Sequence, residues 1–130
     1  MVFGDGFGTF AISINGAGEI TGYYSPSVGA YRGFVRSVDG SITAFGVDGM
    51  TSTNPQSINP KGFVVGYAGN EDQAAHGFIR APGGHISTFQ APGGGDLSGG
   101  TTGESINPSG VIAGYFIDAS NIFHGFVLTP

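Results

Sequence analysis

The sequence predicts an all-β fold made of three copies of one unit, and two observations lead to this prediction. Three short motifs recur in constant register, separated by steps of 44 and 48 residues. Ser-Ile-Asn begins at Ser13, Ser57 and Ser105, Gly-Tyr begins at Gly22, Gly66 and Gly114, and Gly-Phe begins at Gly33, Gly77 and Gly125. Between the turns, segments of strand length are rich in Ile, Val, Thr, Phe and Tyr, and no helical period occurs.

Each unit is expected to contain four short antiparallel strands. The first strand ends in Ser-Ile-Asn and leads into a tight turn, Asn-Pro-x-Gly or Asn-Gly-x-Gly, in which the Asn side chain can cap the backbone. The second strand is expected at 19–24, 63–68 and 111–116, and the third at 31–36, 75–80 and 123–128. The fourth strand, at 40–45, recurs once, at 84–89.

Apolar residues occupy both faces of the expected second and third strands, which indicates sheets covered on both sides. Four-stranded antiparallel sheets that cover one another are the blades of a β-propeller, and a period of about 40 to 50 residues is typical of such blades. We therefore expect one repeat domain, 1–130, with repeats at about 4–47, 48–91 and 92–130. A β-trefoil and a β-prism are the alternatives.

Three blades need a partner, because propellers have about four to eight. Phe3 precedes Asp5 much as Phe45 precedes Asp48, so residues 1–3 are expected to be a displaced outer strand for the third repeat of another subunit. The predicted partner is a second copy of the chain, and the expected homodimer is a closed six-bladed ring without open sheet edges.

The composition argues against several classes of function. The net charge is −5, with four cations in all, so nucleic acid is an unfavourable partner. The chain has no cysteine, which excludes disulfides and thiolate metal sites. No apolar run is long enough to span a bilayer, and the first residues lack the features of a signal peptide.

The repeated residues resemble a known family. Ser-Ile-Asn, a glycine turn, Gly-Tyr, His-Gly-Phe and Ile-Thr-x-Phe are similar to the bacterial extracellular HAF repeat over nearly the whole chain. The second and third units fit best, through His76 and His124, whereas Arg32 replaces the histidine of the first unit. The resemblance implies an extracellular or periplasmic protein with propeller-like architecture, and it implies no single activity.

The longer loops of the expected blades emerge on one face, where function is usually found. Five aspartates map to that face as candidate ligands for Ca²⁺, which prefers oxygen: Asp5, Asp48, Asp72, Asp96 and Asp118. Aspartates before glycine also form ordinary turns, and that alternative stays open. His76 and His124 lie on the same face as candidate catalytic bases, or as structural hydrogen-bond partners.

Two functions remain open at this point. No nucleophile elbow, zinc-protease helix or phosphate loop is present in the sequence. The first candidate is a binding module for small ligands or glycans, with repeated sites between blades. The second is a calcium-dependent hydrolase of lactones or esters, in which Ca²⁺ polarises the carbonyl and His76 or His124 activates water. The repeated tyrosines are expected either to pack between blades or to form a sugar platform.

Overall fold

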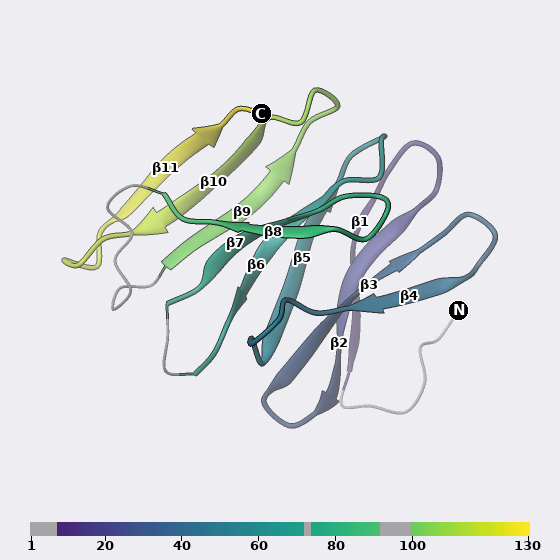
Figure 1. The fold of residues 1–130 in the computed structure, drawn as a ribbon, viewed down its shortest axis with the longest axis horizontal. Helices are drawn as coiled ribbons and strands as arrows, with labels where there is room; N and C mark the ends of the chain where they lie inside the picture. The colour runs from purple at the N-terminus through teal and green to yellow at the C-terminus, as the bar shows by residue number, and fades with distance from the viewer. Residues whose placement is uncertain (1–7, 72–73, 92–99) are drawn as a thin grey trace.

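The computed structural model describes residues 8–71, 74–91 and 100–130. Its three antiparallel meanders follow one another in chain order across the molecule (Figure 1). The first repeat contains β1 (Thr9–Ile14), β2 (Ile20–Ser27), β3 (Ala30–Arg36) and β4 (Ile42–Phe45). The second contains β5 (Ser52–Ile58), β6 (Val64–Gly69), β7 (His76–Arg80) and β8 (Ile86–Phe89). The third contains β9 (Gly100–Ile106), β10 (Ile112–Ile117) and β11 (Phe123–Leu128).

The all-β prediction is confirmed, since no helix occurs among the described residues. Neighbouring strands within each repeat pair antiparallel, and the first two repeats have the expected four strands. The expected outer strand at residues 1–3 falls outside the described part of the chain. The described strands close into no barrel, which a β-trefoil would require. In the ranges that the structure covers, no helix is long and apolar enough to cross a membrane.

The first hairpin of every repeat closes in the same way. The backbone N–H of Asn15 donates to the carbonyl of Glu19 at 3.0 Å, and Asn59 and Asn107 make the equivalent bonds. The glycine that ends each turn adopts a positive φ, between 83° and 91°, which an L-residue disfavours. The predicted Asn-capped turns are therefore confirmed, and glycine is required where each turn ends.

The first strand of every repeat contains a β-bulge. One extra residue interrupts the pairing with the second strand, at Ile12 in β1, Gln56 in β5 and Glu104 in β9. These three positions are related by the same 44- and 48-residue steps as the motifs. A bulge bends its strand and turns the side chains beyond it, so each first strand changes direction at an equivalent point.

The hydrophobic core consists of two clusters, each between consecutive repeats. The first cluster joins one face of the first repeat to the opposite face of the second, through Val35, Phe45, Ile58, Val64 and Phe78. The second joins the next pair of repeats through the equivalent positions Ile79, Phe89, Ile106, Ile112 and Phe126. The rings of Phe45 and Phe78 pack edge to face at 5.9 Å, and those of Phe89 and Phe126 do so at 6.0 Å. Burying a side chain of this size contributes about 1.5 to 3 kcal/mol.

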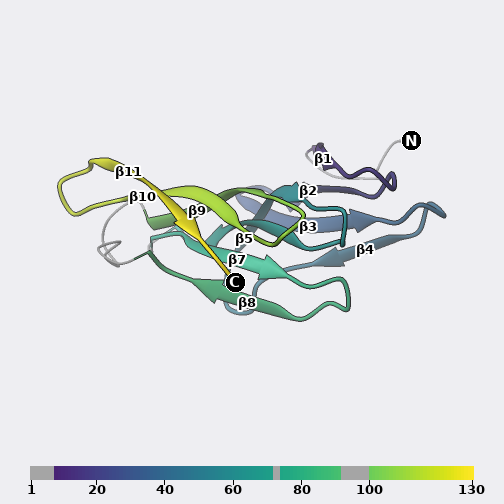
Figure 2. The ribbon, with the colours of Figure 1, turned by 90° about the horizontal axis from the view of Figure 1, so that it is seen from above.

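Consecutive repeats also meet at their strand edges. A single parallel bridge joins Tyr31 to Ser52, and an equivalent one joins Ala75 to Gly100. Seen from above, β1 and β4 lie at opposite sides of the first meander (Figure 2). The repeats therefore stack face to face with a constant relationship, and each one covers its neighbour.

Candidate functional site

His76 contacts Gln90, a residue that joins the second repeat to the third. The side-chain amide of Gln90 lies 3.3 Å from both ring nitrogens of His76. The Gln90 carbonyl oxygen accepts a hydrogen bond from the buried hydroxyl of Thr101 at 3.1 Å, and the same hydroxyl accepts from the Ala91 N–H. His76 therefore lies at one end of a polar network that Gln90 extends to the third repeat, and its role as a catalytic base stays a prediction.

His124 has a different environment, in the hairpin between β10 and β11. Its Nε2 donates to Oδ2 of Asp118 at 2.7 Å, and its ring stacks on Phe116 with the centroids 4.9 Å apart. The other carboxylate oxygen of Asp118 accepts from the N–H groups of Ser120 and Ile122. The hydrogen bond from His124, followed by those from the backbone, lowers the pKa of Asp118 below its ordinary value.

The predicted calcium ligands are only partly described. Asp5, Asp72 and Asp96 lie outside the described residues. Asp48 is exposed in the turn that the Met50 N–H closes onto the Val47 carbonyl at 3.1 Å, and Asp118 caps its own hairpin. Among the residues with a described position, no three acidic or histidine side chains gather as a metal site. The calcium site stays a prediction.

A small pocket opens on the long-loop face of the second repeat, where Gly29 of the first repeat borders it. Its volume is about 250 Å³. It is lined by Gly29, Thr51, Ser52, Asn54, Tyr67, Gly69, Asn70, Glu71 and Ala75. Hydrogen bonds from Asn70 to the backbone of Gly49 and from the Thr51 N–H to Asn70 hold one wall of it in place. No lysine or arginine lines the pocket, so its chemistry is neutral to acidic.

Asn54 is the unusual residue of this pocket. The residue as a whole is 8% exposed, and no hydrogen bond joins its amide to a described residue. The amide atoms are not among the fully buried side-chain atoms that lack a partner, so they reach the solvent of the pocket. An amide that lines a cavity in this state has two donors and an acceptor ready for a ligand or water.

Tyr67 lines the pocket beside Asn54, because the two residues are direct partners in the antiparallel pairing of β5 and β6. It is half-buried, and desolvation raises the pKa of its phenol, with smaller contributions from Tyr23, Tyr115 and Glu104. The hydroxyl therefore stays protonated through the physiological range and can both donate and accept a hydrogen bond.

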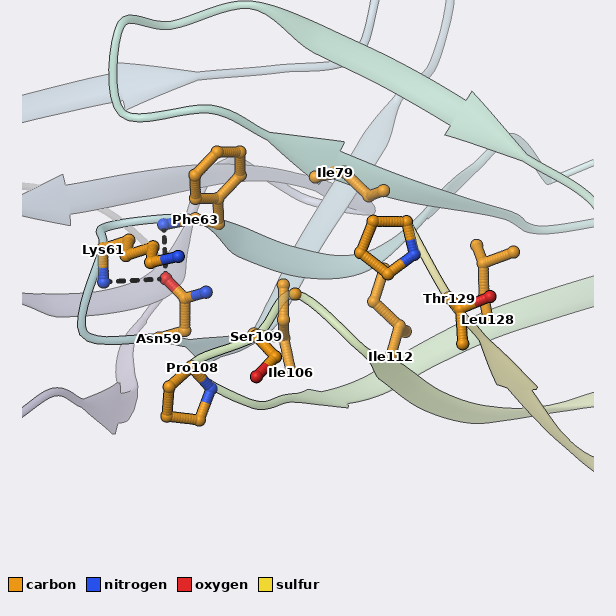
Figure 3. A pocket seen from close by; sticks show the side chains of 12 residues that line it. Asn59, Lys61, Phe63, Ile79, Ile106, Pro108, Ser109, Ile112, Leu128 and Thr129 are labelled. Atoms are coloured by element: carbon orange, nitrogen blue, oxygen red, sulfur yellow. Dashed lines mark hydrogen bonds between the residues drawn. The ribbon is translucent and has the colours of Figure 1, made fainter.

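A second cavity lies between the second and third repeats, on the opposite, short-turn face, and is almost wholly apolar (Figure 3). Its volume is about 320 Å³, and Phe63, Ile79, Ile106, Ile112 and Leu128 form most of its wall. At the first junction between repeats, Ile86 of β8 packs against the equivalent apolar cluster. The described part of the third repeat has no strand in the position of β8, so the cavity marks the place where such a side chain would lie.

Comparison with known proteins found no match, whether against models of protein families, curated proteins or solved structures. The resemblance to the HAF repeat therefore stays an expectation from the sequence. Any functional conclusion has to come from the geometry of this chain.

Sequence reasoning did not identify Asn54, although a signal was present. Asn54 precedes Pro55, and a proline inside a strand indicates a bulge or an edge. The bulge of β5 does follow Pro55. The equivalent positions in the other repeats are Phe10 and Thr102, so the repeat pattern itself gives no reason to single out an asparagine there.

Proposed function

We propose that the protein is a binding module whose repeats are blades of a β-propeller, and that the small pocket on the long-loop face of the second repeat binds a sugar unit of a neutral glycan. The observation that carries the proposal is the Asn54 amide, which lines the pocket in a residue that is otherwise buried and makes no hydrogen bond with a described residue. A ligand hydroxyl supplies what this amide lacks, because a hydroxyl both donates and accepts.

The remaining lining favours the same class of ligand. The Tyr67 hydroxyl and the exposed Glu71 carboxylate add a donor and two acceptors, and the Tyr67 ring offers an apolar surface. No lysine or arginine lines the pocket to neutralise an acidic ligand. The carboxylate or phosphate of such a ligand would be desolvated next to the negative charge of Glu71, which is unfavourable. A small, shallow pocket binds weakly by itself, and several pockets in one assembly gain through multivalency.

Export to the periplasm or the extracellular space fits this proposal, as the sequence resemblance implies. A low content of charged side chains, 10% of the chain, leaves hydroxyl, amide and backbone groups to form most of the polar surface. Glycans are recognised by groups of that kind.

The experiment is a titration of the isotopically labelled protein with neutral and acidic oligosaccharides, followed by backbone amide NMR. Neutral saccharides are expected to shift the signals of residues 51–54 and 67–71, and Asn54→Leu is expected to weaken binding about tenfold, the equivalent of 1.4 kcal/mol. Tyr67→Phe removes only a hydroxyl and should also weaken it. Tyr115→Phe, the equivalent change outside this pocket, is the matched control. Saccharide shifts that survive Asn54→Leu unchanged would refute the assignment of the site.

A second candidate, the calcium-dependent lactone or ester hydrolase, draws on one observation. A carboxylate that orients an imidazole, as Asp118 does His124, is the usual partner of a general base. The test is hydrolysis of simple lactones with and without a chelator. Hydrolysis that is lost both on addition of a chelator and in His124→Asn supports the hydrolase. A folded protein that hydrolyses no lactone with or without Ca²⁺ eliminates it.

A further inference from the structure

The two junctions between repeats use the same contacts at equivalent positions. At the first, the Ser13 hydroxyl accepts from the Ile58 N–H at 3.2 Å, and the Asn15 amide donates to the Asn59 carbonyl at 3.0 Å. At the second, Ser57 accepts from Ile106 at 3.3 Å and Asn59 donates to Asn107 at 3.1 Å. The junction is thus a defined interface, seen twice, in which one half contributes the serine and asparagine side chains and the other half contributes backbone groups.

The third repeat presents one half of this interface without a partner. Ser105 and Asn107 stand where Ser13 and Asn15, or Ser57 and Asn59, stand at the internal junctions, and their side chains contact no fourth repeat in the described chain. Val127 is 70% exposed, although Val35, its equivalent in the first repeat, is 8% exposed under the second. An apolar sheet face of this kind is expected to be covered.

The first repeat presents the complementary half. Ile14 is 65% exposed, whereas its equivalents Ile58 and Ile106 are 5% and 8% exposed because the preceding repeat covers them. The Asn15 carbonyl accepts a hydrogen bond from the Gly18 N–H within its own turn. The carbonyls of Asn59 and Asn107 also accept one from the asparagine side chain of the preceding repeat, and the Asn15 carbonyl has no such second donor among the described residues. The two free halves therefore match, one at each end of the molecule.

The outer edge of β11 is unpaired among the described strands. In the first two repeats a fourth strand pairs with the third, and its phenylalanine lies against a glycine: a Cβ on Gly77 would come within 2.3 Å of the Phe89 ring. A Cβ on Gly125 would meet nothing closer than 3.9 Å. The open space at Gly125 is the position that Phe89 fills in the second repeat. On the other face of β11, the apolar cavity at Leu128 is the position equivalent to that of Ile86.

We propose that the third repeat of one chain binds the first repeat of a second copy. Ser105 and Asn107 then bond the backbone of Ile14 and Asn15 of the partner, and Val127 is buried, as Val35 is within the chain. The contact joins unlike surfaces, so two chains that exchange it reciprocally close a ring.

The test is the mass of the protein in solution, measured by light scattering over a range of concentrations. We expect a dimer, and expect Ile14→Arg and Val127→Arg each to give a single chain, because each destroys one half of the interface. Val38→Arg, also at an exposed valine but in the hairpin between β3 and β4, is the control and should leave the dimer intact. Circular dichroism checks that all three variants fold.

Mixing the Ile14→Arg and Val127→Arg variants distinguishes this interface from other possible contacts between chains. One half is intact in each variant, so an equimolar mixture should recover pairs, held by one junction in place of two. A folded protein that stays a single chain at every concentration overturns the proposal. So does a dimer that survives both arginine variants, or a mixture that stays unpaired.

Discussion

The side-chain amide of Asn15 donates a hydrogen bond to the backbone carbonyl of Asn59, and Asn59 repeats that bond to Asn107. The same asparagines accept, through Oδ1, the backbone N–H groups two and four residues on in their own turns. One side chain thus caps a hairpin with its oxygen and joins two repeats with its nitrogen. This double role favours asparagine at positions 15 and 59, since the carboxylate of Asp only accepts and could not supply the donor between repeats.

Asn59→Asp is predicted to destabilise the fold. The substitution keeps the oxygen that caps the turn, removes the donor to Asn107, and places a negative charge beside a carbonyl in a buried position. We expect the free energy of unfolding to fall by about 1 to 3 kcal/mol. Chemical denaturation at a concentration where the protein is a single chain measures it.

Asn107→Asp is the matched control for that experiment, because the amide of Asn107 has no partner repeat in the described chain. Under the same dilute conditions, Asn107→Asp should lower the free energy of unfolding far less than Asn59→Asp does. Equal losses in the two variants would show that the turn, and not the bond between repeats, carries the stability.

Gly66→Ala is predicted to destabilise the second repeat. A Cβ at this position would lie 2.2 Å from the backbone oxygen of Asn54, which a side-chain rotation cannot relieve. Accommodation needs a backbone shift at the bulge of β5, with a cost of about 1 to 3 kcal/mol. Gly125→Ala makes the same change in β11, where the space is open, and should be close to neutral in the single chain. Thermal unfolding of the two variants compares them directly.

Arg80→Leu is predicted to raise stability by about 1 kcal/mol. The Arg80 guanidinium lies 5.0 Å from the centre of the Phe45 ring, and its Nε is buried without a partner among the described residues. An unpaired buried N–H costs about 1 to 3 kcal/mol, whereas a cation–π contact contributes about 0.5 to 2 kcal/mol. The chain already places leucine at the equivalent position, Leu128. Urea denaturation measures whether the substitution raises or lowers the free energy of unfolding. A decrease would show that the contact of the guanidinium with the Phe45 ring contributes more than the unpaired Nε costs.

The Asp118 and His124 pair predicts a pH dependence with a definite sign. Because the pKa of Asp118 is lowered in the folded state, its contribution to stability is complete above the ordinary value of 3.8 and is lost as the pH falls through the folded pKa. His124→Phe removes the leading cause, so the pKa of Asp118 should rise toward 3.8. Carboxyl NMR titration measures this shift. The pKa of Asp39, lowered by hydrogen bonds from Ser41, serves as the internal reference and should not move.

Much of the fold could be predicted from the residues because the repeat carries its chemistry locally. An Asn-x-x-Gly turn, an apolar strand and a Gly-Tyr pair specify a hairpin wherever they occur, and three copies in register specify three similar sheets. The site residues were not predicted with the same certainty: His76 and His124 lie in β7 and β11, and Asp48 and Asp118 in turns. What they do there depends on neighbours: Gln90 for His76, and His124 for Asp118.

The sequence by itself determined the repeat, the all-β class and the turns that end its strands, since these depend on backbone preferences within a few residues. Only the tertiary structure decided which equivalent positions are covered and which are left open. Ile14 and Ile58 occupy the same place in their repeats, yet one is exposed and the other buried. The physical reason is that burial and pairing come from the adjacent repeat, more than forty residues away in the chain. A local pattern therefore cannot tell a repeat with a neighbour from one without.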